Sequence, residues 1–140
     1  MRLLIALAFL LALSGCMDQD IQFTEVFSEK NTNQRVAADY VIDSEEDWEQ
    51  MWEEFFSHIT PPPTRPRIDF SREMILIVCL GERPSTGYKA VVENITRTDG
   101  MLRVRYSEIE PEGLVGMMIT YPCTAVSIPH SDLPVAFERI

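Results

Sequence analysis

The chain has 140 residues, of which 46% are hydrophobic and 24% are charged, and its formal net charge at pH 7 is -10. This size and composition suit one globular domain with a modest core and are too small for two. Nucleic-acid binding needs a cluster of Lys and Arg residues, which the sequence lacks, so we expect no nucleic-acid partner.

Residues 1–15 have the pattern of a bacterial lipoprotein signal peptide. Arg2 supplies a positive start, and residues 3–13 form an apolar run of 11 residues. A membrane-spanning helix needs roughly 20 apolar residues, so this run has the length of a signal sequence. The motif Leu13-Ser14-Gly15-Cys16 matches the lipobox, in which small residues precede a cysteine whose thiol receives diacylglycerol. An ordinary secretory signal with an incidental cysteine is the alternative.

Lipidation of Cys16 would attach the mature chain to a membrane, because two or more acyl chains anchor a protein stably. Residues 16–22 are then predicted to be the lipidated cysteine and a short polar tether, followed by one domain over residues 23–140. Cys16 is followed by Met17 and not by Asp, which favours the outer membrane under the enterobacterial sorting rule. We therefore expect a lipid-anchored protein of the cell envelope that faces the periplasm or the cell exterior.

The first half of the predicted domain contains two strands and the one clear helix. Residues 23–27 and 36–42 have strand-like composition. A helix is predicted from the N-cap Ser44 to residue 59. Its apolar positions recur with helical spacing: Trp48, Met51, Trp52, Phe55, Phe56 and Ile59. The opposite, acidic face is interpreted as a solvated surface, with a basic partner as the alternative, and the prolines after it end the helix.

The remainder of the chain is predicted to be β-structure. Residues 74–80 are apolar throughout, as in a central strand that is buried on both faces. Further strands are expected over residues 88–95, 102–107, 117–128 and 135–139. The predicted fold class is α+β and mostly β: an antiparallel β-sandwich or barrel-like sheet with one amphipathic helix packed on it.

No set of residues has the pattern of a catalytic or metal site. The two histidines, His58 and His130, are far apart, and Ser131 and Asp132 share one loop with His130, whereas catalytic triads assemble from separate elements. We therefore predict a protein that is not an enzyme and that binds no cofactor or metal. The cysteines Cys79 and Cys123 are either a disulfide, which an oxidising compartment would permit, or two buried thiols.

The loop of residues 81–88 joins the most apolar strand to the next one. Gly87 can adopt a positive φ, and Pro84 stiffens the approach to it. Tyr88 adds a large amphipathic ring of the kind that is common in binding hot spots. The segment predicts either a binding loop or a structural hairpin loop.

Residues 69–140 resemble the C-terminal domain of PrcB, a subunit of a protease complex on spirochaete surfaces. The resemblance rests on Asp69-Phe70-Ser71, on the apolar strand ending at Leu80-Gly81, on Ser85-Thr86-Gly87-Tyr88 and on Thr120-Tyr121-Pro122. Members of that family often have a second Gly after the Thr, where this chain has one. The resemblance implies an accessory role that stabilises or restrains a protease, without enzymatic activity.

The motif Pro84-Ser85-Thr86-Gly87-Tyr88 is also similar to a binding loop of the chagasin-like inhibitors of cysteine proteases, which have an immunoglobulin-like fold. Arg83 replaces the Asn of that motif, and Ala90 replaces its Trp. Residues 112–116 and 121–123 would be the second and third loops. In those inhibitors the loops wedge into the protease cleft without covalent chemistry.

The partner-binding residues expected from these resemblances are Arg83, Pro84, Ser85, Thr86, Gly87, Tyr88 and Tyr121. The leading hypothesis is a membrane-tethered, non-enzymatic module that binds, stabilises or inhibits a protease through the 83–88 loop. It predicts that an exposed loop of residues 83–88 clusters with residues 112–116 and 120–123 at one end of the sheet structure. The alternative is a structural or interaction lipoprotein of the cell envelope with no protease partner, whose loops are scattered or packed away.

Overall fold

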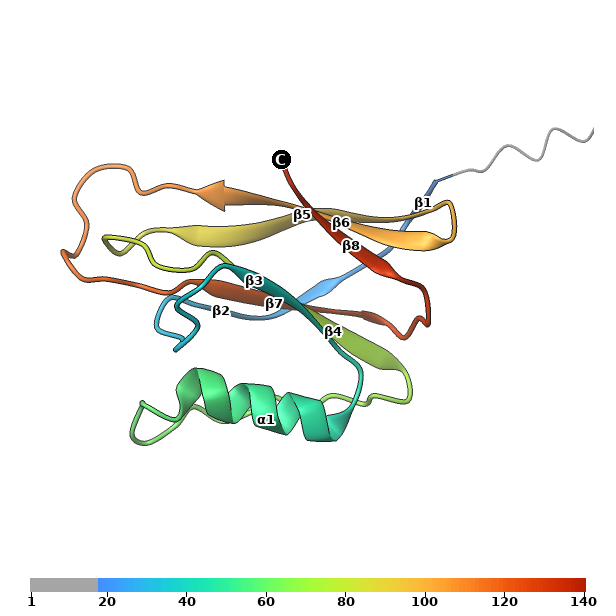
Figure 1. Ribbon diagram of the computed structural model, residues 1–140, viewed down its shortest axis with the longest axis horizontal. Helices are drawn as coiled ribbons and strands as arrows, with labels where there is room; N and C mark the ends of the chain where they lie inside the picture. The colour runs from blue at the N-terminus through green and yellow to red at the C-terminus, as the bar shows by residue number, and fades with distance from the viewer. Residues whose placement is uncertain (1–17) are drawn as a thin grey trace, which may run out of the picture.

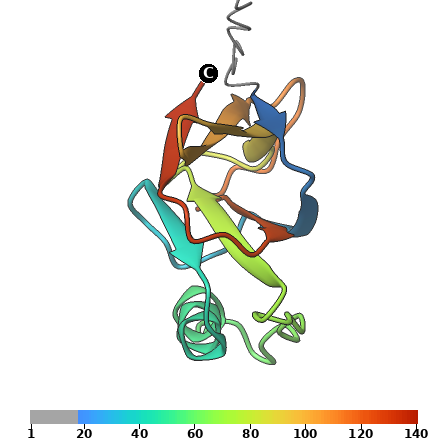
Figure 2. The same cartoon turned by 90° about the vertical axis from the view of Figure 1, so that its right-hand side faces the viewer.

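The structure is a computed structural model that describes residues 18–140, so the predicted signal peptide and Cys16 lie outside the described residues. Two four-stranded sheets lie one on the other, and one helix covers the outer face of the second sheet (Figure 1). Figure 2 shows the same three layers along the strands. The predicted α+β class is confirmed, and of the two predicted sheet forms the sandwich is the one found.

The strand order is β1-β5-β6-β8 in the first sheet and β2-β7-β4-β3 in the second. The elements in chain order are β1 (Gln19–Asp20), β2 (Thr24–Glu29), β3 (Ala38–Ile42), α1 (Glu45–Phe56), β4 (Glu73–Cys79), β5 (Lys89–Thr98), β6 (Met101–Ile109), β7 (Cys123–Pro129) and β8 (Val135–Arg139). Neighbouring strands pair antiparallel except β6 and β8, which run parallel with Leu102 opposite Val135.

Strand β4 is buried on both faces. Ile75 and Ile77 belong to the core between the second sheet and α1, whereas Leu76 and Val78 belong to the core between the two sheets. Successive side chains of a strand alternate between its faces, so one apolar strand supplies both cores. The prediction of a central, doubly buried strand is confirmed.

Helix α1 begins after Ser44, whose Oγ accepts a hydrogen bond from the Asp47 N–H at 3.2 Å. Its buried face carries Trp48, Met51, Phe55 and Phe56, and all four of these side chains face the second sheet as one core cluster with Phe27 of β2. No helix among residues 18–140 has the length and apolarity needed to cross a membrane.

The proline-rich connector after α1 runs back along the helix. The indole N–H groups of Trp48 and Trp52 donate to the carbonyl oxygens of Pro66 and Pro63, each at 3.0 Å. A buried or half-buried indole needs such a partner, so the connector completes the helix–sheet core as well as linking α1 to β4.

Several sequence-based boundaries change. The helix predicted to extend to residue 59 ends at Phe56, and the residues after it form a turn in which the Ile59 N–H donates to the Phe56 carbonyl at 3.1 Å. The strand predicted over residues 117–128 is wrong in its first part: β7 begins only at Cys123, and residues 117–119 are exposed loop. Pro122 has no N–H to donate to a sheet ladder and precedes the strand. In addition, part of the predicted 16–22 tether lies in the sheet, because β1 pairs with β5 and the apolar Ile21 packs on the inter-sheet core.

Cys79 and Cys123 stand directly opposite each other on β4 and β7 and form a disulfide, with their Cα atoms 4.1 Å apart. The sequence alone left this pairing open. The two residues are 44 positions apart in the chain, and the segment between them contains β5, β6 and the loops at their ends.

Replacing both cysteines by Ala is expected to lower the free energy of unfolding by about 3–4 kcal/mol, because the unfolded chain regains the freedom that the crosslink removes. Urea denaturation followed by Trp fluorescence measures the change. Wild-type protein unfolded in the presence of a reducing agent is the matched control and should approach the midpoint of the double variant. An unchanged midpoint in the variant would show that the bond does not stabilise the fold.

Candidate functional site

Three loops meet at one end of the sandwich, here called the loop end. They connect β2 to β3, β4 to β5 and β6 to β7, and they lie on the left of Figure 1. Antiparallel pairing brings the strand ends together: Ala38 and Cys123 both lie opposite Cys79, and Ile109 lies opposite Lys89. Residues 83–88, 112–116 and 120–123 therefore cluster as the leading hypothesis predicts, but within 83–88 only Pro84 and Gly87 are exposed, so the exposure that it predicts for this loop is wrong for most of the loop.

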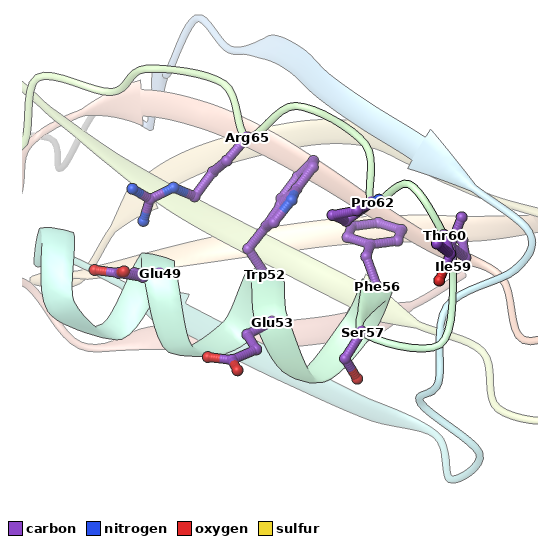
Figure 3. Close-up of a pocket in the computed structure, with 9 residues that line it drawn as sticks. All are labelled: Glu49, Trp52, Glu53, Phe56, Ser57, Ile59, Thr60, Pro62 and Arg65. Carbon is purple, nitrogen blue, oxygen red and sulfur yellow. The ribbon is translucent and has the colours of Figure 1, made fainter.

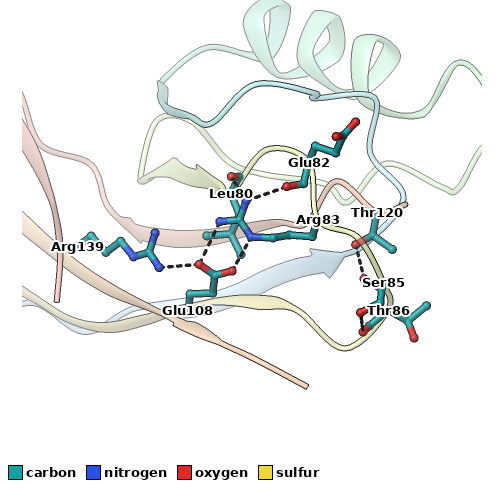
Figure 4. A network of polar contacts seen from close by, with 8 residues as sticks. All are labelled: Leu80, Glu82, Arg83, Ser85, Thr86, Glu108, Thr120 and Arg139. Carbon is teal, nitrogen blue, oxygen red and sulfur yellow. Dashed lines mark hydrogen bonds and ion pairs between the residues drawn. The ribbon is translucent and has the colours of Figure 1, made fainter. Parts of the chain in front are cut away.

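The β4–β5 and β6–β7 loops are locked together by hydrogen bonds. The backbones of Arg83 and Thr120 exchange two N–H···O bonds of 2.9 Å. The Thr86 N–H donates to the Gly116 carbonyl at 3.0 Å, and the Gly116 N–H donates to Thr86 Oγ1 at 2.7 Å. The buried Thr120 hydroxyl also donates to the Ser85 carbonyl at 2.9 Å. These five bonds make the two loops one unit, part of which is drawn in Figure 4.

Arg83, Glu108 and Arg139 form a network of ion pairs, here called the brace, in which both arginines contact the Glu108 carboxylate. Arg83 Nε and Nη2 donate to both oxygens of Glu108 at 2.5 and 3.0 Å, and Arg139 Nη2 donates to the same carboxylate at 2.6 Å (Figure 4). The remaining Nη1 donates to the carbonyls of Leu80 and Glu82 at 3.0 and 2.9 Å. Four hydrogen bonds thus hold the guanidinium within the protein, and Arg83 serves to hold the loop in shape.

The brace shifts the ionisation of both partners. The Glu108 side chain is only 6% exposed. Even so, the hydrogen bond from Arg83 holds the pKa of its carboxyl below the ordinary value of 4.5, aided by the charges of Arg83 and Arg139 and opposed by burial. The same hydrogen bond raises the pKa of Arg83. Glu108 is thus a charged, nearly buried group whose charge is needed for the position of the loop.

Gly87 and Tyr88 complete the β4–β5 loop. Gly87 has a φ of +95°, and a Cβ atom there would lie 2.5 Å from Cβ of Pro111, so the position requires glycine. The Tyr88 ring is half-buried, and the Cζ atom of Arg83 lies 5.9 Å from its centroid, in cation–π geometry.

The predicted partner-binding residues differ in how accessible they are. Pro84 and Gly87 are exposed, Thr86, Tyr88 and Tyr121 are half-buried, and Ser85 is buried. The Tyr121 ring lies under the guanidinium of Arg35, at 5.9 Å, and its N–H donates to the Lys30 carbonyl at 2.7 Å. Most of the motif therefore supports the loop end from within and offers solvent little side-chain surface.

Large apolar side chains that face solvent gather in the β6–β7 loop. Five of the eight large apolar side chains that are exposed among residues 18–140 lie at the end of β6 or in this loop: Ile109, Leu114, Met117, Met118 and Ile119. Leu114 is completely exposed and Met117 is 90% exposed. We call residues 114–119 the apolar loop. Clustered apolar side chains that a folded protein leaves in water mark interaction surfaces.

Sequence reasoning placed residues 112–116 in a loop but missed the second half of the apolar loop, because it predicts a strand that begins at residue 117. A usable signal was present. Gly113 and Gly116 interrupt the apolar segment, and its side chains do not alternate with polar ones as those of a half-buried strand would.

Other groups in the described part of the chain do not assemble into a reactive site. His130 Nε2 lies 3.2 Å from Asp132 Oδ1, but both residues belong to one exposed turn, in which Ser131 Oγ accepts the Leu133 N–H. No group of three or more His, Cys, Asp or Glu side chains that could hold a metal ion occurs among residues 18–140.

A separate hollow of about 430 Å³ lies between α1 and the proline-rich connector (Figure 3). Trp52, Phe56 and Pro62 form apolar walls, with Glu49 and Glu53 at the rim. Its lining contains no histidine, cysteine or lysine, and the aromatic side chains are part of the helix–sheet core. The hollow follows from the packing of the connector against α1.

The substitution Glu108→Gln is expected to lower the free energy of unfolding at pH 7 by about 2–3 kcal/mol, because two arginines lose a charged acceptor. The contribution of Glu108 is fully present above its ordinary pKa of 4.5 and is lost as the pH falls through its lower pKa in the folded protein. Urea denaturation of wild type and variant from neutral to strongly acidic pH measures both effects.

The exposed Glu112 provides the control, and Glu112→Gln should leave the stability unchanged. A stability difference between wild type and Glu108→Gln that stays constant as the pH falls would contradict an ionic role for Glu108.

A known protein family matches the part of the chain that contains the two locked loops. The family described as PrcB C-terminal matches residues 74–129, which run from β4 to the end of β7. An uncharacterized protein of Methanocaldococcus jannaschii is 37% identical over 54 residues, which are 39% of this chain and 33% of that protein. The chain thus spans about a third of the length of this curated relative. No solved structure matches the chain. Residues 74–129, which contain both locked loops, are thus similar to the PrcB C-terminal family.

Proposed function

We propose that this protein is a non-enzymatic binding module that holds a protease or a protease complex at its loop end. The observation that carries the proposal is the locked pair of loops, which keeps the apolar loop exposed within a PrcB C-terminal-like region. A loop that is rigid before binding loses little conformational entropy when it binds, so such a surface suits a specific partner.

The locked loops also support a binding mode without chemistry on the partner. The Ser85 hydroxyl donates to the Thr86 carbonyl, and the Ser85 carbonyl accepts from the Thr120 hydroxyl. Thr86 Oγ1 accepts from the Gly116 N–H. Ser85 and Thr86 therefore act as supports, and the contact area comes from side chains on the rim of the loop end. Chagasin-like inhibitors insert loops into a protease cleft, and we propose the same binding mode for this loop end.

We further propose that lipid on Cys16 tethers the module to the cell envelope. The first described strand, β1, pairs with Arg97 at the far end of β5, whereas the loop end lies at Lys89. Eight residues of extended strand separate these points by roughly 25 Å. A tether that joins the domain at β1 would therefore hold the loop end away from the membrane and toward a partner (Figure 1).

Residues 18–140 are expected to bind at least one member of a panel of papain-like cysteine proteases and trypsin- and subtilisin-type serine proteases. Surface plasmon resonance measures binding, and substrate cleavage measures inhibition. The double variant Pro84→Glu, Tyr88→Ala should weaken binding by about tenfold or more because it alters the rim of the loop end. Arg97→Ala at the opposite end is the control and should bind like wild type. If no protease binds, the alternative of an envelope lipoprotein without a protease partner is favoured.

The full chain expressed in a bacterium is expected to sediment with membranes, and Cys16→Ala should release it, because acyl chains supply the anchoring free energy. Membrane fractionation measures the distribution, and mass spectrometry of the N-terminal peptide detects the acyl groups. Cys16→Ala protein that sediments like wild type would rule out lipid as the anchor.

A further inference from the structure

The apolar loop is held at several points, so its exposed side chains have a defined position. Gly116 is bonded to Thr86, and Thr120 is bonded to Arg83, on either side of the exposed residues 117–119. Between them the Met118 N–H donates to the Gly116 carbonyl at 3.0 Å. The brace at Glu108 fixes Arg83 in turn. The loop therefore presents Met117 and Ile119 at a defined position between these anchors, and the exposed Leu114 lies two residues before the Gly116 anchor.

The charges beside the apolar loop select the kind of partner. Glu110 and Glu112 are exposed immediately before it, and no Lys or Arg occurs between Arg105 and Arg139. Loops and helices that insert into lipid surround their apolar side chains with Lys and Arg, which meet anionic headgroups. Here the flanking charge is negative and would be repelled by such a surface. Arg35 and Lys30 belong to the β2–β3 loop, where both contact Tyr121.

We infer that the apolar loop is the principal contact of the loop end, and that its partner is a protein with an apolar pocket bordered by Lys or Arg. Leu114 and Met117 enter the pocket, while Glu110 and Glu112 pair with its basic border. Methionine suits this role because its flexible side chain adapts to an irregular pocket. The inference rests on the proposed function for the existence of a protein partner, and it assigns the contact to residues outside the 83–88 motif.

Site-specific photocrosslinking in the cells that produce the protein tests the inference. The full chain carries benzoylphenylalanine at position 114 or, as the matched control, at position 140, where Ile140 is also exposed. Position 114 should crosslink to a different protein, at a site with apolar side chains beside Lys or Arg, and position 140 should not. Crosslinks from position 114 only to lipid or to a second copy of this chain, or no more crosslinking than from position 140, would overturn the inference.

Binding of the full chain to the purified crosslinked protein supplies the second measurement. Leu114→Glu should weaken binding by about tenfold or more, as expected for a buried anchor. Glu110→Gln with Glu112→Gln should weaken it by about threefold and reduce its salt dependence. Ile140→Glu should change nothing. Full binding by Leu114→Glu, or an unaltered salt dependence in the glutamine variant, would overturn the inference.

The two proposals fail in different ways. A crosslinked partner that meets the chemical criteria but is not a protease would support the inference and reject the protease function. A protease that binds wild type and Leu114→Glu equally, but not the Pro84→Glu, Tyr88→Ala variant, would support the protease function and reject the inference.

Discussion

The burial of β4 on both faces is the constraint on which the rest of the structure depends. One strand supplies side chains to the inter-sheet core and to the core beneath α1, so each layer is packed against a common element. Its hydrogen bonds to β7 and β3 and its disulfide to Cys123 hold it from both sides. Because the strand cannot shift without disturbing two cores, the point where it ends is fixed, and the β4–β5 loop starts from a rigid base.

The loop end continues that rigidity with polar groups. Glu108 comes from β6, Arg83 from the β4–β5 loop and Arg139 from the end of β8, so one carboxylate joins three segments of the chain. Such a group is stabilising only when both oxygens are satisfied, as they are here. The consequence for function is a change of roles. The motif residues form the support, and the apolar loop that the support carries is the surface that we propose a partner meets.

The two ends of the sandwich have different properties. At one end β1 brings the chain into the first sheet beside the β5–β6 turn, and at the other the three loops converge. Strands β5 and β6 run from one end to the other, so the proposed attachment site at β1 and the proposed binding site at the loop end lie at opposite ends of the domain. With this arrangement, a short tether at β1 would still let the loop end point away from the membrane.

Features that depend on a local pattern of residues could be predicted from the amino-acid sequence. Period-3.6 spacing and the Ser44 cap defined the helix, an unbroken apolar run identified β4, and short motifs indicated the PrcB-like region. The disulfide, the parallel β6–β8 pair, the Arg83–Glu108–Arg139 brace and the exposure of Leu114 and Met117 were decided only by the tertiary structure. The first three join residues that are far apart in the chain, and the exposure of a side chain depends on whether distant segments pack over it. Local sequence periodicity contains no information on such long-range contacts.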